Sequence, residues 1–421
     1  MIQLIRGFKD ILPGEVELWQ HIEKTAVTLF QDFGYKEIRI PIMERTELFA
    51  RSIGEDTDIV EKEMYTFPDR KGDLITLRPE ATASICRSYI QHKLHASDPV
   101  RKFYTIGPMF RRERPQKGRY RQFYQINLEV FGIESPLVDV ELIFLLTTLL
   151  TRLSISDVQA HINSLGCPEC RPRFKSALAD FINSTGDRLC SDCIRRKDKN
   201  PLRVLDCKVP GCKEAMTGAP SIIDHLCPEC RDHFEAVKSG LNSLQVPFAV
   251  DPLLVRGLDY YTRTTFEIHT GALGAQSAVA GGGRYDGLIK ALGGPQMPAT
   301  GFAIGFDRLA EIAAMNNDNF EKKPAIFIAA LGEKSSALAF EWSCALGLAG
   351  VVCDMYLTGK SLKSQMKRAD RLGAKYVLIL GDREIEENAA ILRNMLTKEQ
   401  TPIGLDNIVD RILTKLGLEA K

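Results

Sequence analysis

The densest charged segment of the chain runs from Phe110 to Glu129 and reads FRRERPQKGRYRQFYQINLE. Six arginines and lysines fall within eleven consecutive residues, with one glutamate, Glu113, among them. Pro115 and Gly118 break the middle into a loop, and the apolar positions that follow suggest a strand. Arginine forks bind phosphate oxygens, and aromatic rings placed between them can stack on a base. The segment therefore predicts a site for a polyphosphate and a base; the alternative is a solvated basic turn.

The cysteines form a second chemical pattern. Eight of the eleven lie in four close pairs, CPEC, CSDC, CKVPGC and CPEC. Neighbouring thiolates can converge on one tetrahedral ion, and this spacing is typical of structural zinc sites with four sulfur ligands. Four pairs can combine in three ways. Because the outer pairs bracket the segment, we favour one site from Cys167, Cys170, Cys227 and Cys230, and a second from Cys190, Cys193, Cys207 and Cys212. The alternative is a former zinc module whose reduced cysteines now pack without metal.

Short strands and helices must position the basic segment. The stretches VRKFYTIGPMFRRE and FYQINLEVFG are expected to form the two arms of a long hairpin on either side of the loop. LWQHIEKTAVTLFQDFG has helical spacing, YKEIRIPIME alternates as a strand that ends near Pro41, and DLITLRPEATASICRSYI reads as a strand that turns into a helix. Adjacent strands of this kind indicate an antiparallel sheet and an α+β fold. The sequence has no Walker loop and no GxGxxG after a strand, which disfavours the common nucleotide folds.

Two domains are expected. Residues 1–320 form the first, and it contains the Cys-rich insertion at about 165–235, which we expect to be helical. The polar stretch NNDNFEKK reads as a linker. In residues 324–421, PAIFIAALG, VVCDMYL and KYVLILGD read as three strands separated by helices, as in a small α/β domain.

Composition limits the function classes. The formal net charge of +1 gives no global field to attract nucleic acid, so any such binding must use local patches. The N-terminus has no apolar core typical of a secretory signal, and the run Leu142–Leu150 is too short to span a bilayer. An odd number of cysteines without a signal argues against a disulfide framework. We therefore expect a cytoplasmic protein.

Four stretches together carry a family resemblance. The basic segment, LRPEAT (Leu77–Thr82), LVRGLDYYTRTTFE (Leu254–Glu267), and GGGRYDGL followed by GFAIGFDRL resemble the motifs of class II aminoacyl-tRNA synthetases, specifically the histidyl-tRNA synthetases. The resemblance covers nearly the whole chain. It implies a class II antiparallel-sheet domain and a C-terminal α/β anticodon-binding domain. It also implies ATP-dependent formation of histidyl-adenylate, transfer of histidine to the 3′-terminal ribose of its tRNA, and a homodimer with its interface near Pro41.

The resemblance also implies roles at the ATP site. Arg111 would contact the α-phosphate, Glu113 the adenine side and Arg119 the γ-phosphate, while Phe123 would stack under adenine. Arg308 would clamp the terminal phosphates, and Mg²⁺ would accompany ATP. These roles use positioned cations instead of a protein nucleophile.

Further residues match the family's amino-acid and tRNA contacts. Arg256 would lie against the α-phosphate and the substrate carboxylate; the alternative is an arginine paired with a nearby acid such as Asp259. The amine and carboxylate of histidine would meet Glu80, Thr82 and Gln125, and its imidazole would meet Glu129, Tyr261 and Tyr285. Gln116 and Lys117 would reach the acceptor end of the tRNA.

Two competing functions remain open at this point. A regulatory relative, such as the regulatory subunit of ATP phosphoribosyltransferase, would bind histidine without charging tRNA, but such relatives typically have eroded motifs and no anticodon-binding domain. A zinc-dependent nucleic-acid-binding module without enzymatic activity is disfavoured by the near-neutral charge and by the confinement of the cysteine pairs to one insertion. The cysteine pairs are not a general feature of the family, so the resemblance does not support them.

Overall fold

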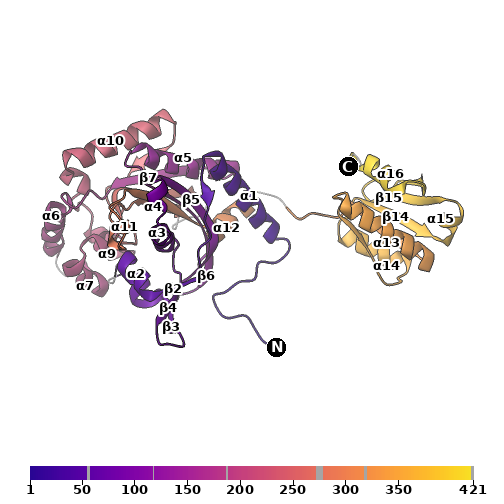
Figure 1. The fold of residues 1–421 in the computed structure, drawn as a ribbon, viewed down its shortest axis with the longest axis horizontal. Helices are drawn as coiled ribbons and strands as arrows, with labels where there is room; N and C mark the ends of the chain where they lie inside the picture. Colours follow the sequence, from indigo (N-terminus) through magenta and orange to yellow (C-terminus); the bar gives the residue numbers. More distant parts are fainter. Residues whose placement is uncertain (55–56, 117, 186–187, 272–277, 317–319, 419–421) are drawn as a thin grey trace. The chain divides into compact units, whose positions relative to one another are not determined.

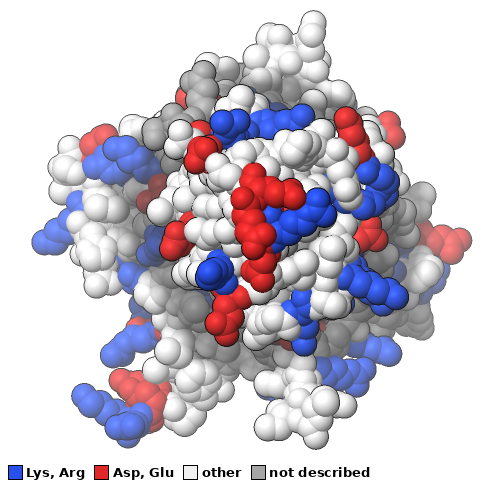
Figure 2. Space-filling view, turned by 90° about the vertical axis from the view of Figure 1, so that its right-hand side faces the viewer, with Lys and Arg blue, Asp and Glu red and all other residues white. Residues whose placement is uncertain are grey.

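The structure is a computed structural model that describes residues 1–54, 57–116, 118–185, 188–271, 278–316 and 320–418. The chain divides into two compact units, Met1–Phe320 and Glu321–Lys421 (Figure 1). Acidic and basic side chains are interspersed over the face drawn in Figure 2, in keeping with the small net charge. Among the described residues, no helix is long and apolar enough to cross a membrane.

An eight-stranded sheet forms the centre of the first unit, in the order β1-β5-β6-β11-β10-β9-β7-β8. Its internal pairs are antiparallel, and only the outermost pairs, β1 with β5 and β7 with β8, are parallel. The strands are β1 (Lys36–Glu37), β5 (Arg101–Phe110), β6 (Gln122–Phe131), β7 (Val158–Ser164), β8 (Phe248–Val250), β9 (Thr262–Thr270), β10 (Ala278–Arg284) and β11 (Ala299–Gly305). The expected hairpin is present as β5 and β6, which pair along their full length.

Long helices cover one face of this sheet: α1 (Val16–Asp32), α5 (Leu137–Arg152), α10 (Pro228–Ser243) and α12 (Phe306–Asn316). Their apolar stripes pack on the strand side chains that point to the same side, such as Ile126 and Leu128 of β6 and Phe302 and Ile304 of β11. This is the main hydrophobic core, and burial of this amount of apolar surface fixes the register of each strand, because a one-residue slip would turn the buried set to the other face.

The opposite face of the sheet carries α3 (Thr82–Gln91) and α11 (Leu288–Ala291), which pack on a smaller core. Strand β6 alternates cleanly between the two faces. Its residues Ile126, Leu128 and Val130 enter the main core, so Gln125 and Glu129 face α3. The polar side chains of the hairpin are therefore held on the side of the sheet away from the long helices.

A small three-stranded sheet lies beside these elements, in the order β2-β4-β3. It consists of β2 (Met43–Arg45), β3 (Tyr65–Pro68) and β4 (Leu74–Leu77), and it is accompanied by α2 (Thr46–Ile53) and the π-helix η1 (Ile59–Glu63), whereas the short helix α4 (Leu94–Ser97) packs on α3. The strand expected to end near Pro41 is shorter than its alternation suggested: β1 covers only Lys36–Glu37, and a separate strand, β2, follows Pro41. The segment pairs with β5 at β1 and with β4 at β2, and Pro41, which has no N–H to donate, lies between the two.

The Cys-rich insertion is helical, as expected. It runs through α6 (Arg171–Ser184), α7 (Ser191–Lys199), α8 (Leu202–Leu205), α9 (Pro210–Ala215) and the 3₁₀ turn η3 (Ile222–His225) into α10. It has a hydrophobic core of its own, built by residues such as Phe174, Leu178 and Ile222 together with buried cysteines.

The second unit is a five-stranded mixed sheet in the order β13-β12-β14-β15-β16, with its own core. Its strands are β12 (Ile326–Leu331), β13 (Cys353–Met355), β14 (Tyr376–Gly381), β15 (Ala389–Asn394) and β16 (Gln400–Gly404), and its helices are α13 (Glu333–Leu348), α14 (Leu362–Arg371), α15 (Asp382–Glu386) and α16 (Ile408–Leu416). The first three strands were expected from sequence, whereas the β15–β16 hairpin was not.

Candidate functional site

The sheet face below α3 is hollowed because small residues lie beside the polar side chains of β6. Glu129 is paired across to Gly301 of β11, and Gln125 is paired to Gly305. A Cβ added at Gly301 would overlap the Glu129 carboxylate. Absent side chains on one strand therefore make room for carboxylate and amide groups on the next.

Glu129 is the centre of a buried polar cluster. It is 1% exposed, accepts a hydrogen bond of 2.6 Å from the Thr82 hydroxyl, and accepts a second from the Tyr285 hydroxyl. Burial raises the pKa of Glu129 from its usual 4.5 to about 8, and the two hydroxyl donors oppose that rise. The carboxyl is therefore largely protonated at neutral pH until a cation is placed beside it.

Glu80 closes the same hollow at the start of α3. Its carboxylate accepts hydrogen bonds from the backbone N–H groups of Thr82 and Ala83, at 2.6 and 3.0 Å, and so satisfies donors that the first turn of a helix leaves free. Burial raises the pKa of Glu80, although these N–H groups pull it down. Gln125 brings an acceptor, because its Oε1 is buried and has no hydrogen-bond partner within the described parts of the chain.

Aromatic rings form the wall of the hollow next to α11. Tyr260 lies 4.7 Å from Tyr261 and 5.5 Å from Tyr285, measured between ring centroids. Tyr261 and Tyr285 are buried, as the sequence-derived roles require. Sequence reasoning missed Tyr260, which belongs to the same cluster; its position directly before Tyr261 in LVRGLDYY was the available signal.

Arg256 lies over the glycine strand β10. A Cβ at Gly281 would come within 2.6 Å of its guanidinium carbon, so the arginine rests against bare backbone. It forms an ion pair with Glu267 of β9 and not with Asp259, the acid named as its alternative partner. Burial alone would lower the pKa of Arg256, and Glu267 raises it. Its Nε is buried and has no hydrogen-bond partner among the described residues, which leaves one donor for a ligand.

The basic hairpin loop brings its charged groups to the same face. The Arg111 guanidinium lies 5.2 Å from the centre of the Phe123 ring. Glu113 lies between Arg111 and Arg119, at 3.8 and 3.7 Å from their nitrogens. Arg308 lies in the first turn of α12. Burial lowers the pKa of Arg308, and the nearby cation of Arg119 lowers it further. Like charges held this close favour an anionic ligand between them.

The tip of the loop is only partly described. Gln116 and Arg119 exchange backbone hydrogen bonds and close a tight turn. Lys117, which was expected to meet tRNA, lies outside the described residues.

The eight paired cysteines gather into two groups of four, Cys167, Cys170, Cys227 and Cys230, and Cys190, Cys193, Cys207 and Cys212. Within each group the sulfur atoms lie within 4.8 Å of one another, and this is the partition favoured from their spacing. The Sγ atom of Cys167 lies 3.6 Å from that of Cys170 and 3.9 Å from that of Cys227. Four sulfurs around zinc at about 2.3 Å would be separated by about 3.8 Å, so the arrangement fits that ion.

Backbone donors favour thiolates in both groups. The N–H of Cys227 donates to the Cys170 sulfur at 3.2 Å, and the N–H of Cys190 donates to the Cys212 sulfur at 3.1 Å. Burial raises the pKa of the Cys170 thiol, but the N–H groups of Cys227 and Cys167 bring it down to about 7. The N–H of Cys193 likewise lowers the pKa of Cys190 to about 7. Burial raises the pKa of the thiols of Cys193, Cys212, Cys227 and Cys230. Metal ligation requires deprotonated sulfur, so the backbone donors favour it at one thiol in each group, and the thiols with a raised pKa would lose their protons on metal binding.

Comparison with known proteins gives the family. Residues 7–309 match the family model described as histidyl-tRNA synthetase, and residues 325–415 match that of the anticodon binding domain. The chain belongs to the histidyl-tRNA synthetase family. It is 64% identical over 412 residues to the histidine–tRNA ligase of Desulfatibacillum aliphaticivorans, which covers 98% of both chains. It is 63% identical over 420 residues to that of Desulforapulum autotrophicum, covering 100% of this chain and 99% of the relative.

A solved structure of the family has the same fold. The apo histidyl-tRNA synthetase of S. aureus superposes with a TM-score of 0.83 at 36% sequence identity, covering 98% of this chain and 100% of that one. The family and the fold class expected from the motifs are confirmed: a class II antiparallel-sheet domain followed by an anticodon-binding domain. Within this histidyl-tRNA synthetase fold, Glu80, Thr82, Glu129, Tyr261 and Tyr285 gather on the α3 face of the central sheet, and Glu113 lies between Arg111 and Arg119 at the hairpin loop.

Proposed function

We propose that this protein attaches histidine to its tRNA in two steps, through histidyl-adenylate. The observation that carries the proposal is the buried cluster of Glu129, Thr82 and Tyr285, which opens on the same sheet face as Arg111 and Arg256. One end of this site offers acceptors for a cationic amino acid, and the other offers cations for phosphate. That pairing suits histidine and ATP.

Histidine recognition uses the carboxyl and hydroxyl groups of the hollow. Glu129 and the tyrosines Tyr261 and Tyr285 hold the imidazole N–H groups, while Glu80, Thr82 and Gln125 hold the α-amine and the carboxylate. A pocket whose polar groups are buried rejects apolar amino acids strongly, because each of them would leave those groups without partners. The unpartnered Oε1 of Gln125 supports this assignment.

Adenylate formation is attack by the histidine carboxylate on the α-phosphorus of ATP, with pyrophosphate as the leaving group. Arg256 and Arg111 stabilise the negative charge that builds on the α-phosphate oxygens. Arg256 is held in place by its ion pair with Glu267, and Arg111 by a hydrogen bond that it donates to the Pro79 carbonyl. Arg119 and Arg308 hold the terminal phosphates, Phe123 stacks on adenine, and Glu113 accepts from its amino group. The chain supplies orientation and fixed charge, not a nucleophile.

Mg²⁺ would enter with ATP and neutralise further charge on the phosphates. The Glu311 carboxylate lies close enough to Arg308 to raise its pKa, and it would offer oxygen ligands of the kind that Mg²⁺ prefers.

The tRNA would meet both units. Gln116 and Lys117 would contact the acceptor end, and residues 324–421 would bind the anticodon.

We also propose a homodimer with its interface near Pro41, and a first domain of residues 1–320 with its insertion at about 165–235. Each cysteine group would hold one structural Zn²⁺; all of its ligands are thiolates, which leaves no position for a substrate.

The deciding experiment is ATP–pyrophosphate exchange with each amino acid in turn, using the full chain, Arg256→Ala and Arg383→Ala. Arg383 is exposed in the second unit and serves as a matched arginine control. We expect exchange that requires histidine, falls at least about 100-fold in Arg256→Ala and is unchanged in Arg383→Ala. If the folded full chain exchanged with no amino acid, the synthetase assignment would fail and a histidine-binding regulatory role would replace it.

A further inference from the structure

The Cys-rich insertion forms hydrogen bonds with the segment that contains two of the proposed substrate-binding residues. Residues 254–261, called here the 254–261 segment, include Arg256 and Tyr261 and form no helix or strand before β9 begins. Such a segment has no sheet or helix ladder to fix it, so contacts with its neighbours decide its conformation.

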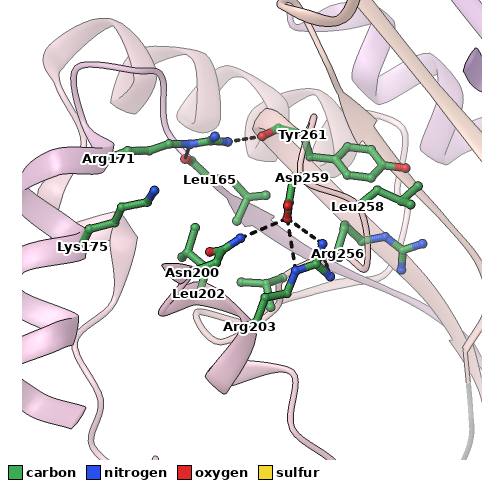
Figure 3. Close-up of a pocket in the computed structure, with 11 residues that line it drawn as sticks. Leu165, Arg171, Lys175, Asn200, Leu202, Arg203, Arg256, Leu258, Asp259 and Tyr261 are labelled. Atoms are coloured by element: carbon green, nitrogen blue, oxygen red, sulfur yellow. Dashed lines mark hydrogen bonds and ion pairs between the residues drawn. The ribbon is translucent and has the colours of Figure 1, made fainter. Parts of the chain in front are cut away.

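Two side chains of the insertion converge on Asp259, as Figure 3 shows. Arg203 of α8 donates to the Asp259 Oδ1 atom from Nη2 at 2.6 Å and from Nε at 3.1 Å, and Asn200 donates to the same oxygen at 3.1 Å. Arg203 also reaches the backbone carbonyl of Arg256, at 3.4 Å. The Arg203 side chain is 12% exposed and that of Asp259 is 34% exposed, so the pair is partly open to solvent, and its two donors and the Asn200 amide converge on one carboxylate oxygen.

A third side chain of the insertion holds the other end of the segment. Arg171, the first residue of α6, donates to the backbone carbonyl of Tyr261 and, at 3.3 Å, to that of Leu165 (Figure 3). Between these contacts lies a cavity of about 280 Å³ whose walls come from both the insertion and the segment, including Leu202, Leu258 and Asp259.

Each insertion residue that contacts the segment lies close in sequence to the cysteines of one group. Arg171 directly follows Cys170 of the outer group. Asn200 and Arg203 lie in the stretch between Cys193 and Cys207, whose two ends both belong to the inner group. Leu202 and Leu205 of the same stretch pack both on the insertion core and on the core that contains Tyr261 and Tyr285.

The opposite side of the segment is held by the body of the first unit. The backbone N–H of Asp259 donates to the Ile53 carbonyl at 3.2 Å, and the Asp259 carboxylate lies against Gly54, where a Cβ would come within 2.6 Å of it. Asp259 is thus fixed from two sides, and removal of the insertion contacts would free one of them.

We propose that the metal-bound insertion positions the 254–261 segment for histidine, with Arg203, Asn200 and Arg171 as positioning residues that act through Asp259 and the segment backbone. The inference rests on the proposed function and deepens it. Loss of these contacts would misplace Tyr261 and Arg256, which would weaken histidine binding and the stabilisation of charge on the α-phosphate. The hairpin loop and α12, which would hold adenine and the terminal phosphates, stay in place.

The test compares Arg203→Met with Arg196→Met in the full chain. Arg196 also joins the insertion to the body, through Asp58, but does so at η1 and away from the segment, so it controls for a general loosening. In pyrophosphate exchange we expect Arg203→Met to raise KM for histidine about tenfold and KM for ATP less than twofold. Arg203→Lys should recover part of the loss, because one cation remains. Arg203→Met combined with Asp259→Ala should be no worse than the more affected single variant.

A second arm follows the metal without using activity. Zinc is removed by a chelator and then restored, while hydrogen exchange of residues 254–261 and histidine binding by equilibrium dialysis are measured. We expect removal to speed exchange in this segment and to weaken histidine binding, and Zn²⁺ to reverse both effects. If metal-free protein that is still folded bound histidine with full affinity, the proposed role of the metal in positioning the 254–261 segment would be refuted.

Equal changes in the KM values of both substrates, or a response in Arg203→Met no larger than in Arg196→Met, would overturn the positioning role. Failure of the proposed function looks different: the unaltered protein would bind histidine in dialysis and give no pyrophosphate exchange.

Discussion

Glu129 offers a sharp test of the buried histidine pocket, through the replacement Glu129→Gln. The wild-type carboxyl is 1% exposed, and burial raises its pKa to about 8 against 4.5 for an ordinary glutamate. Glutamine has nearly the same shape and takes no part in acid–base equilibria in this range. The difference in stability between the two proteins should therefore vary with pH in a manner set by Glu129 alone.

The sign and size follow from proton linkage. Between pH 4.5 and 8 the folded protein holds a proton on Glu129 that the unfolded chain has lost, so the free energy of unfolding of the wild type falls as the pH rises. Each unit of pH is worth about 1.4 kcal/mol, so the change from pH 5.5 to 7.5 is about 3 kcal/mol. Glu129→Gln has no carboxyl group at this position, so its free energy of unfolding does not fall in this way. The free energy of unfolding of the variant minus that of the wild type should therefore rise by about 3 kcal/mol over that range and level off above pH 8.

Urea unfolding can measure this in the first unit alone. The chain has two tryptophans, Trp19 and Trp342, and Trp19 stacks on Phe306 at 4.3 Å within the main core. Trp19 fluorescence in a Trp342→Phe background reports the first unit. Exposed Glu47→Gln is the matched control, against which the change for Glu129→Gln is compared. A flat or falling difference for Glu129→Gln would refute the reasoning that a protonated carboxyl is buried there.

Three further outcomes are expected. Phe123→Ala should raise KM for ATP about tenfold in pyrophosphate exchange with KM for histidine unchanged, because a base–aromatic stack is worth about 1–3 kcal/mol; a rise in KM for histidine instead would contradict the assignment. Gly301→Ala should abolish histidine-dependent exchange, because its Cβ would overlap the Glu129 carboxylate, whereas Gly287→Ala, with open space around the added atom, should behave as the wild type. Elemental analysis should find two zinc ions per chain and one in Cys193→Ser, and the idea of two separate sites fails if that variant loses both.

The sequence predicted the elements whose signals are local. The β5–β6 hairpin followed from apolar alternation on both sides of a Pro- and Gly-containing loop, and α3 followed from the change of period after LRPEAT. The spacing of the cysteine pairs indicated metal sites, and the partition into two groups was favoured because the outer pairs bracket the insertion; the structure groups the sulfurs in the same way. The extent of strands was harder: the alternation before Pro41 predicted one strand ending near that residue, and only the pairing with two different strands shows that β1 and β2 lie on either side of it.

Contacts between distant segments were beyond the sequence. Arg256 was assigned a nearby acid as its alternative partner, but the sheet brings Glu267 to it, and Asp259 is taken by Arg203, which lies 56 residues earlier in the chain. Many arginines and carboxylates could form such pairs, and the choice depends on how the insertion packs on the body of the unit. Tyr260 was missed for a related reason: of two adjacent tyrosines, only the three-dimensional packing shows that both face the hollow.

The two cysteine groups are nested along the chain, since every ligand of the inner group lies between Cys170 and Cys227 of the outer group. As the chain emerges from the ribosome, the inner group is complete once Cys212 has been made, whereas the outer group must wait for Cys230. Nested closure needs no threading of one loop through another, so the insertion can assemble from the inside outward while β9 to β11 are still unmade. The order of synthesis would then place a finished insertion beside the sheet before the 254–261 segment arrives to be held; a chain ended at residue 220 that binds no zinc would contradict this order.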